Sequence, residues 1–162
     1  MRLPSLFVVL LASFLLLSAC ETDDDAAPTL QTDVPFRQDG SLAFLTPEGD
    51  SLVAITIEIV ETPADRQRGL MYRRSMPSQS GMLFIMDAEE EQTFTMENTY
   101  VPLDMIFVST DSAVVDVAKR TRPLEQIVTS KAPAKYVIEV RAGFADRYGI
   151  TDSTRVAWQR GE

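Results

Sequence analysis

The stretch SLVAITIEIVE (residues 51–61) alternates strongly apolar side chains with smaller or polar ones. Its isoleucines stand at positions 55, 57 and 59, so they fall on one face of an extended chain. This period of two is typical of a β-strand with one buried face. The four residues PEGD (47–50) suit a hairpin loop between it and the shorter apolar run 41–46. The segment therefore predicts antiparallel strands with the isoleucine face turned inward.

The residues directly after this strand predict a helix. Thr62 can cap its first turn, Pro63 suits the first helical position, and Asp65 lies where the helix dipole favours a negative charge. We expect the helix to run from residue 63 to about Arg74.

Short apolar runs along the rest of the chain predict further strands. They lie at residues 82–86, 93–98, 103–109, 114–119, 135–141 and 154–159. Turns are expected at 87–92 and 110–112, a longer loop at 120–134, and a helical turn at 144–148. Many short strands with one early helix predict a mainly β fold, a compact antiparallel sandwich or barrel-like domain over residues 41–162.

The N-terminal residues indicate export. The apolar run 6–17 is shorter than the roughly 20 residues that a membrane span needs, but it suits a secretory signal peptide. It ends in Leu17-Ser18-Ala19-Cys20, which resembles the lipobox of bacterial lipoproteins. That resemblance implies cleavage after residue 19 and a lipid on Cys20. Glu21 then favours the outer membrane facing the periplasm in a Gram-negative cell. The alternative is an ordinary signal peptide with a chance cysteine.

Residues 20–40 contain six acidic residues and few apolar ones. Such a composition buries too little apolar surface to offset the entropy of ordering. We therefore expect a lipidated, acidic and disordered tether between the membrane and the domain.

The composition excludes several kinds of chemistry. The chain has no histidine, a single cysteine at position 20 and a formal net charge of −9. Catalysis by Ser-His-Asp or Cys-His groups and zinc sites of Cys and His ligands are therefore excluded. A negative protein repels phosphate backbones, so we expect no nucleic-acid partner. No cofactor is predicted.

Polar residues interrupt the apolar stretch MENTYVPLDMIF (96–107). Asn98 tolerates left-handed backbone and Pro102 cannot donate to a strand ladder, so we expect a corner between two strands. Asp104 is flanked by apolar residues, and a buried carboxylate needs a partner, for which Arg73 is the candidate. The predicted ligand pocket comprises Arg73, Asn98, Thr99, Asp104 and Glu139. The alternative is a purely structural ion pair beside a hydrogen-bonded corner.

Two other functions stay open at this point. The six methionines that follow the signal peptide all lie within residues 71–105, and thioethers select Cu(I), so Met82, Met86 and Met96 are candidate ligands. Ordinary core packing by a flexible side chain is the competing explanation. A carboxylate pair such as Glu97 and Asp104 could serve a hydrolase, but no cluster of substrate-binding aromatic residues accompanies it.

Four ordered blocks carry a resemblance to a known family. They are RGLMYR (68–73), GMLF (81–84), TMENT (95–99) followed by PLDMIF (102–107), and VIEV (137–140) followed by Ala142-Gly143. Together they resemble the bacterial and archaeal domain of unknown function 192 over residues 50–160. The resemblance implies a compact, mostly β domain with one early helix, and no reaction. This chain departs from the family pattern at Thr95, where a tryptophan is usual, and at Glu97, where a lysine is usual.

The sequence therefore predicts a lipid-anchored envelope protein that binds something without catalysis. The partner is expected to be either a small ligand or another envelope protein.

Overall fold

The isoleucine-rich stretch forms β2 (Ser51–Val60), and Ile55, Ile57 and Ile59 are buried as predicted. The structure is a computed structural model that describes residues 34–124 and 127–161. The predicted signal peptide, Cys20 and residues 20–33 of the predicted tether lie outside the described residues.

Strands make up most of the regular structure, so the predicted mainly β class is confirmed. The other strands are β1 (Gly40–Leu45), β3 (Ser80–Glu90), β4 (Thr93–Thr95), β5 (Leu103–Val108), β6 (Val114–Thr121), β7 (Ile127–Thr129), β8 (Ala134–Arg141) and β9 (Arg155–Arg160). The described helices are α1 (Pro63–Arg68) and α2 (Phe144–Tyr148).

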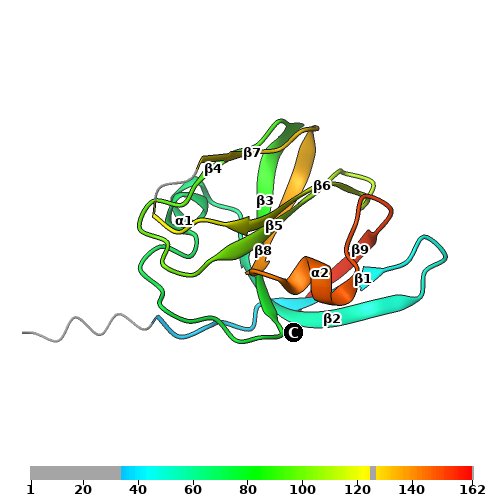
Figure 1. Cartoon of the computed structure of the whole chain (residues 1–162), viewed down its shortest axis with the longest axis horizontal. Helices are drawn as coiled ribbons and strands as arrows, with labels where there is room; N and C mark the ends of the chain where they lie inside the picture. Colours follow the sequence, from blue (N-terminus) through cyan, green and yellow to red (C-terminus); the bar gives the residue numbers. More distant parts are fainter. Residues whose placement is uncertain (1–33, 125–126, 162) are drawn as a thin grey trace, which may run out of the picture. The chain divides into compact units, whose positions relative to one another are not determined.

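Seven strands form one sheet in the order β6-β5-β8-β3-β2-β1-β9, and β4 pairs with β7 in a second, small sheet (Figure 1). Every strand pair is antiparallel except β2 and β3, which run parallel. A parallel pair needs a crossover connection, and here the segment containing α1 supplies it. The antiparallel prediction therefore missed one pairing.

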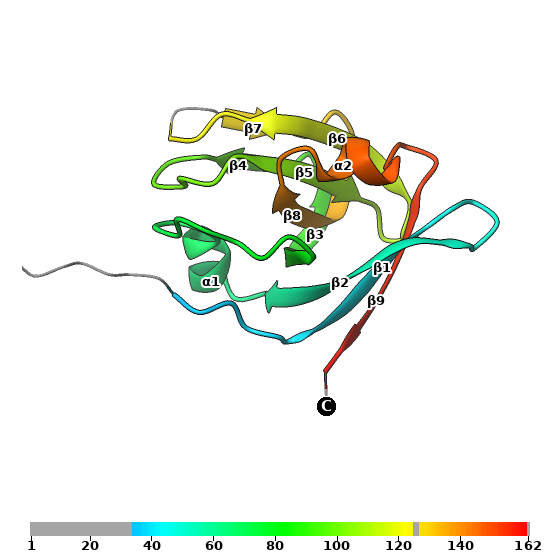
Figure 2. The ribbon, with the colours of Figure 1, turned by 60° about the horizontal axis from the view of Figure 1, so that its bottom comes forward.

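β5 and the second half of β8 bury residues on both faces of the sheet, which divides the core in two. Alternate residues along β8, such as Ile138 and Val140, pack with β1, β2 and α2. The residues between them face a second core that includes Phe84, Met105 and Leu70. In Figures 1 and 2, α1 and the β4–β7 pair lie at the same end of the domain. This end carries the second core.

Helix α1 begins as predicted and ends earlier. Thr62 Oγ1 accepts a hydrogen bond from the Asp65 backbone N–H, which confirms the predicted cap. The helix ends at Arg68 rather than near Arg74, because Gly69 leaves the helical conformation with φ +44°. A Cβ at Gly69 would lie 3.2 Å from the ring of Phe84, so the glycine lets the backbone pack against that ring.

Three other boundaries differ from the prediction. β3 continues through the polar residues 87–90, where we expected a turn. β4 ends at Thr95 because Asn98 turns the chain with φ +54°, which confirms the predicted corner. β7 lies inside the predicted loop 120–134, where three residues pair with β4.

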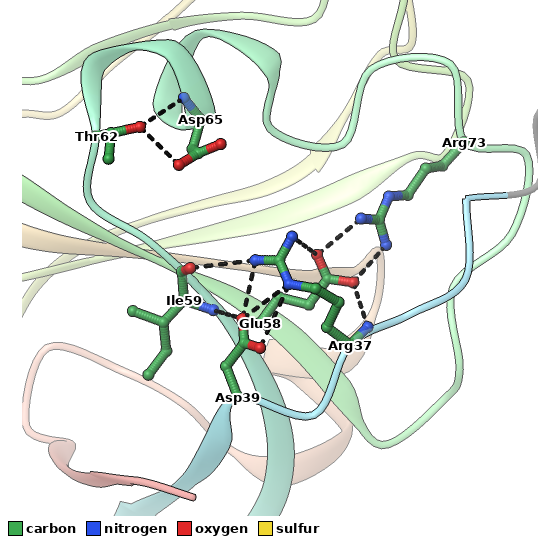
Figure 3. A network of polar contacts seen from close by, with 7 residues as sticks. All are labelled: Arg37, Asp39, Glu58, Ile59, Thr62, Asp65 and Arg73. Atoms are coloured by element: carbon green, nitrogen blue, oxygen red, sulfur yellow. Dashed lines mark hydrogen bonds and ion pairs between the residues drawn. The ribbon is translucent and has the colours of Figure 1, made fainter.

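A buried ion pair joins three separate segments (Figure 3). Glu58 on β2 is fully buried, and its two carboxylate oxygens accept hydrogen bonds from the two terminal nitrogens of Arg73, each at 2.7 Å. The backbone N–H of Arg37 donates to the same carboxylate at 2.7 Å. Nearby, Asp39 accepts a hydrogen bond from the backbone N–H of Ile59. The folded domain therefore begins before residue 41, and Arg73 pairs with Glu58 rather than with Asp104.

We expect Glu58→Gln to lower the free energy of unfolding by about 3–5 kcal/mol, because it leaves the buried Arg73 guanidinium without a counter-charge. Glu61→Gln is the matched control: its partner Arg160 and Glu61 itself are half exposed, and such pairs contribute less than about 1 kcal/mol. Urea denaturation of both variants checks this, and equal losses would contradict the role assigned to Glu58.

Candidate functional site

A cleft of about 290 Å³ opens beside the end of α1. Its apolar wall comes from the second core and from the loop after α1, and consists of Leu70, Met71, Phe84, Met86 and Phe94. Its polar lining consists of Arg66, Gln67, Arg68, Gly69, Thr93, Thr95, Glu97, Thr99 and Glu139. The rings of Phe84 and Phe94 meet edge to face, with centroids 5.0 Å apart. A mostly apolar hollow with a few polar groups is typical of small-molecule sites.

Glu139 is the most unusual group of this cleft. It lies on β8, directly between Met82 of β3 and Met105 of β5, and is 5% exposed. None of the described residues donates a hydrogen bond to its carboxyl group or pairs with it. Burial away from water disfavours the ionised form and raises the pKa of Glu139 to about 8. Near pH 7 the side chain is therefore mostly a neutral carboxylic acid.

The cleft continues outward along α1. An adjoining hollow of about 350 Å³ is lined by Ala64, Gln67, Arg68, Met71, Glu97 and Asn98, four of which also line the cleft. Glu97 is exposed at this junction. The site therefore has a buried inner end at Glu139 and an open outer end at the Asn98 corner.

The structure brings together some of the predicted pocket residues and separates the others. Thr99 and Glu139 line the cleft, and Asn98 lines its outer extension. Arg73 does not line it, because its guanidinium is held by Glu58. It borders a separate hollow of about 50 Å³ with Arg37 and Glu58.

Asp104 lies on the opposite face of the sheet, so its predicted place in the pocket is wrong. Its neighbour Met105 is paired with Glu139, and successive side chains of a strand point to opposite faces. Asp104 is fully buried and accepts hydrogen bonds from the backbone N–H groups of Arg120, at 2.8 Å, and Ala145, at 2.9 Å. It thereby caps the first turn of α2, whose own capping residue is a glycine.

Arg66 lines the cleft, but its guanidinium is engaged by groups other than Glu139. It donates to the carbonyl oxygens of Glu61 and Ile85 and pairs with Asp87. Arg68, the last residue of α1 and also part of the lining, is exposed. Neither cation pairs with Glu139.

The predicted methionine ligands share one core. Met82 and Met96 are each 1% exposed, and Met86 packs against the same core at the cleft wall. The Met96 sulfur accepts a hydrogen bond from the Thr121 hydroxyl at 3.4 Å. Within residues 34–124 and 127–161, no group of three or more His, Cys, Asp or Glu side chains could hold a metal ion. Cu(I) binding stays a prediction.

The carboxylate pair proposed for a hydrolase is not brought together. Glu97 lies at the open mouth of the cleft, whereas Asp104 is enclosed on the other face of the sheet. A shared substrate therefore has no access to both groups.

A larger hollow, of about 390 Å³, lies beside α2. Its lining includes Arg141 and Arg147, and the second of these stacks on Tyr148. The lining offers exposed cations beside a five-residue helix, whereas the cleft beside α1 contains a carboxyl group that is 5% exposed and bonded by none of the described residues. We therefore place the candidate site at Glu139.

Much of the cleft wall was not predicted from sequence. Phe84, Met86 and Phe94 carry no signal beyond that of ordinary core residues. Thr95 and Glu97, in contrast, are the two departures from the family pattern, and both line the cleft.

No helix among the described residues is long and apolar enough to cross a membrane.

Solved structures of other proteins have a similar fold, whereas comparison with curated proteins gives no match. A crystal structure described as a putative transcription regulator from Sinorhizobium meliloti is 32% identical, with a TM-score of 0.71, and the match covers 77% of this chain and 96% of that one. A protein of unknown function from Novosphingobium aromaticivorans is 31% identical, with a TM-score of 0.68, covering 73% and 84%.

The family model for DUF192, described as "Uncharacterized ACR", matches residues 44–158, which include both cores and the cleft. The predicted family is thereby confirmed, and the chain belongs to the DUF192 family.

Proposed function

We propose that this protein is a non-catalytic binding domain that takes a small ligand in the cleft beside α1. The observation that carries this function is Glu139, a carboxyl group that lies inside the domain without a partner among the described residues and borders an open cavity. Among the described residues no fully enclosed side-chain N or O atom lacks a hydrogen-bond partner, so the unbonded Glu139 oxygens are open to the cleft. A polar group with so little access to water gains from a partner, and a ligand that bonds to this carboxyl group would supply one.

The residues that line the cleft indicate which kind of ligand would fit it. The side chains of Met71, Phe84 and Phe94 suit an apolar body, and Glu139 at the inner end suits one hydrogen-bonding or charged group. The cavity lies near the lower end of the volumes of small-molecule sites, about 300 Å³. We therefore expect a compact molecule with one polar end rather than a polymer.

Binding fits the lining better than catalysis does. The titratable side chains around the cleft are those of Arg66, Arg68, Glu97 and Glu139. Of these only Glu139 is buried, and Arg66 is paired with Asp87. General acid–base catalysis needs groups placed together at one reacting centre. A single acid in an apolar wall serves recognition.

We further propose that the domain works at the cell envelope, attached by a lipid on Cys20. The lipobox-like residues 17–20 and the acidic stretch after them support this attachment. The first described residue, Val34, and Arg37 line the small hollow that also contains Arg68 and Met71. Because Arg68 and Met71 line the cleft as well, the chain enters the domain beside the ligand site.

We expect a small molecule to co-purify with the wild-type protein and to be released by denaturation, where mass spectrometry identifies it. Glu139→Gln removes the acid, and Thr95→Trp places a large ring at the cleft, so both variants should lose most of it. Glu48→Gln, in the hairpin loop away from the cleft, is the matched control and should retain it. An equal amount on all four proteins, each checked for folding by circular dichroism, would contradict the proposed site.

Mass spectrometry of the protein from bacterial membranes tests the attachment. The expected N-terminal residue is Cys20 carrying a diacylglycerol, because two or more acyl chains anchor a protein firmly. A mature chain that begins elsewhere, or with an unmodified Cys20, would exclude the lipid anchor and leave the cleft unaffected.

A further inference from the structure

The inner end of the cleft carries an acid but no cation among the described residues. The charged groups that face Glu139 across the cleft are Arg66 and Arg68 on the α1 side and Glu97 at the corner. The strands packed on either side of Glu139 contribute Met82 and Met105, which are uncharged. Burial raises the pKa of Glu139.

The two arginines of the lining do not pair with Glu139. Arg66 donates to two carbonyl oxygens and pairs with Asp87, and Arg68 is exposed at the end of α1. Elsewhere the domain does pair its buried carboxylates: Glu58 receives Arg73. Glu139 has no such partner among the described residues, which leaves its carboxyl group open to a group that enters the cleft.

We propose that the cleft recognises an ammonium group carried on a small apolar body, with Glu139 as the carboxylate that pairs with it. This deepens the binding function proposed above and depends on it. The bound state is an ion pair enclosed by thioether and aromatic side chains. No covalent bond changes in the ligand, which keeps its ammonium proton, while Glu139 releases its proton to water.

Three features of the site favour a cation over an anion or a neutral group. An anion at Glu139 would meet another acid, and neither arginine of the lining pairs with that acid. Glu97 adds negative charge at the entrance, and the formal net charge of −9 attracts cations over a longer range. The rings of Phe84 and Phe94 line the path, and aromatic rings attract cations.

Releasing the Glu139 proton has a measurable consequence. Because the pKa of Glu139 is about 8 in the free protein, most molecules must lose this proton when an ammonium binds near neutral pH. An alkylammonium keeps its own proton in this range, as lysine does with a pKa of about 10. The association constant of an amine should therefore rise about tenfold from pH 6 to pH 7. A neutral hydrogen-bond acceptor should show no such rise.

The test uses the full chain in lipid nanodiscs and isothermal titration calorimetry with three probes of similar shape: benzylamine, benzyl alcohol and benzoate. We expect benzylamine to bind at least tenfold more tightly than either other probe. At pH 7, titrations in buffers of different ionisation enthalpy should show the release of nearly one proton. Glu139→Gln should abolish both the preference and the proton release.

Glu48→Gln, in the hairpin loop away from the cleft, is the charge-matched control. It removes one exposed negative charge that solvent screens, so the affinity for benzylamine should change by less than about threefold. A tenfold loss in this variant with none in Glu139→Gln would assign recognition to the net charge and overturn the proposal.

Other outcomes distinguish a failure of the ammonium proposal from a failure of the proposed binding function. If benzyl alcohol or benzoate binds as tightly as benzylamine, or if amine affinity falls as pH rises, the ammonium proposal fails while the cleft remains a binding site. If no probe binds the wild-type chain but a co-purified molecule is found at Glu139, the ammonium proposal survives only when that molecule is an amine. If neither is found, both proposals fail.

Discussion

A carboxyl group inside a protein needs a partner, because burial disfavours its charged form and leaves its oxygens without water. Among the described residues three acidic side chains are buried: Glu58, Asp104 and Glu139. Glu58 receives a bidentate arginine, and Asp104 receives two backbone N–H groups. Glu139 receives neither and borders a cavity. Within one small domain, this difference separates the two structural acids from the acid that we propose binds a ligand.

The topology explains how an acid in a central strand reaches a cavity. Because β2 and β3 run parallel, the chain must cross over between them, and this crossover places the end of α1 beside Phe84. The β4–β7 pair lies at the same end and leaves the cleft between itself and the crossover. Successive side chains of β8 point to opposite faces of the sheet. Glu139 therefore faces the side of the cleft, while Ile138 and Val140 pack in the other core. The cleft is a consequence of the one parallel pairing.

The period of two in β2, the cap at Thr62 and the corner at Asn98 could be predicted from sequence, since each depends on neighbouring residues. The family and the mainly β class could also be predicted. The partners of buried charged residues could not be predicted, because they depend on strand register. Asp104 and Glu139, for example, face opposite sides of the sheet, although both follow apolar residues. Arg73 was paired with the wrong acid for the same reason. Glu58 gave no signal, since it occupies a normal outward position in the β2 pattern.

The proposed role of the cleft depends on one property of Glu139: its carboxyl group is almost fully buried and has no partner among the described residues. Its pKa can be measured directly in the full chain by NMR titration of the ¹³C-labelled side-chain carboxyl groups, with Glu139→Gln assigning the resonance. The structure predicts a midpoint of about 8. A midpoint near that of an ordinary glutamate, about 4.3, would mean that water or a cation already reaches the group, and it would contradict the assignment of Glu139 as an unpaired buried acid.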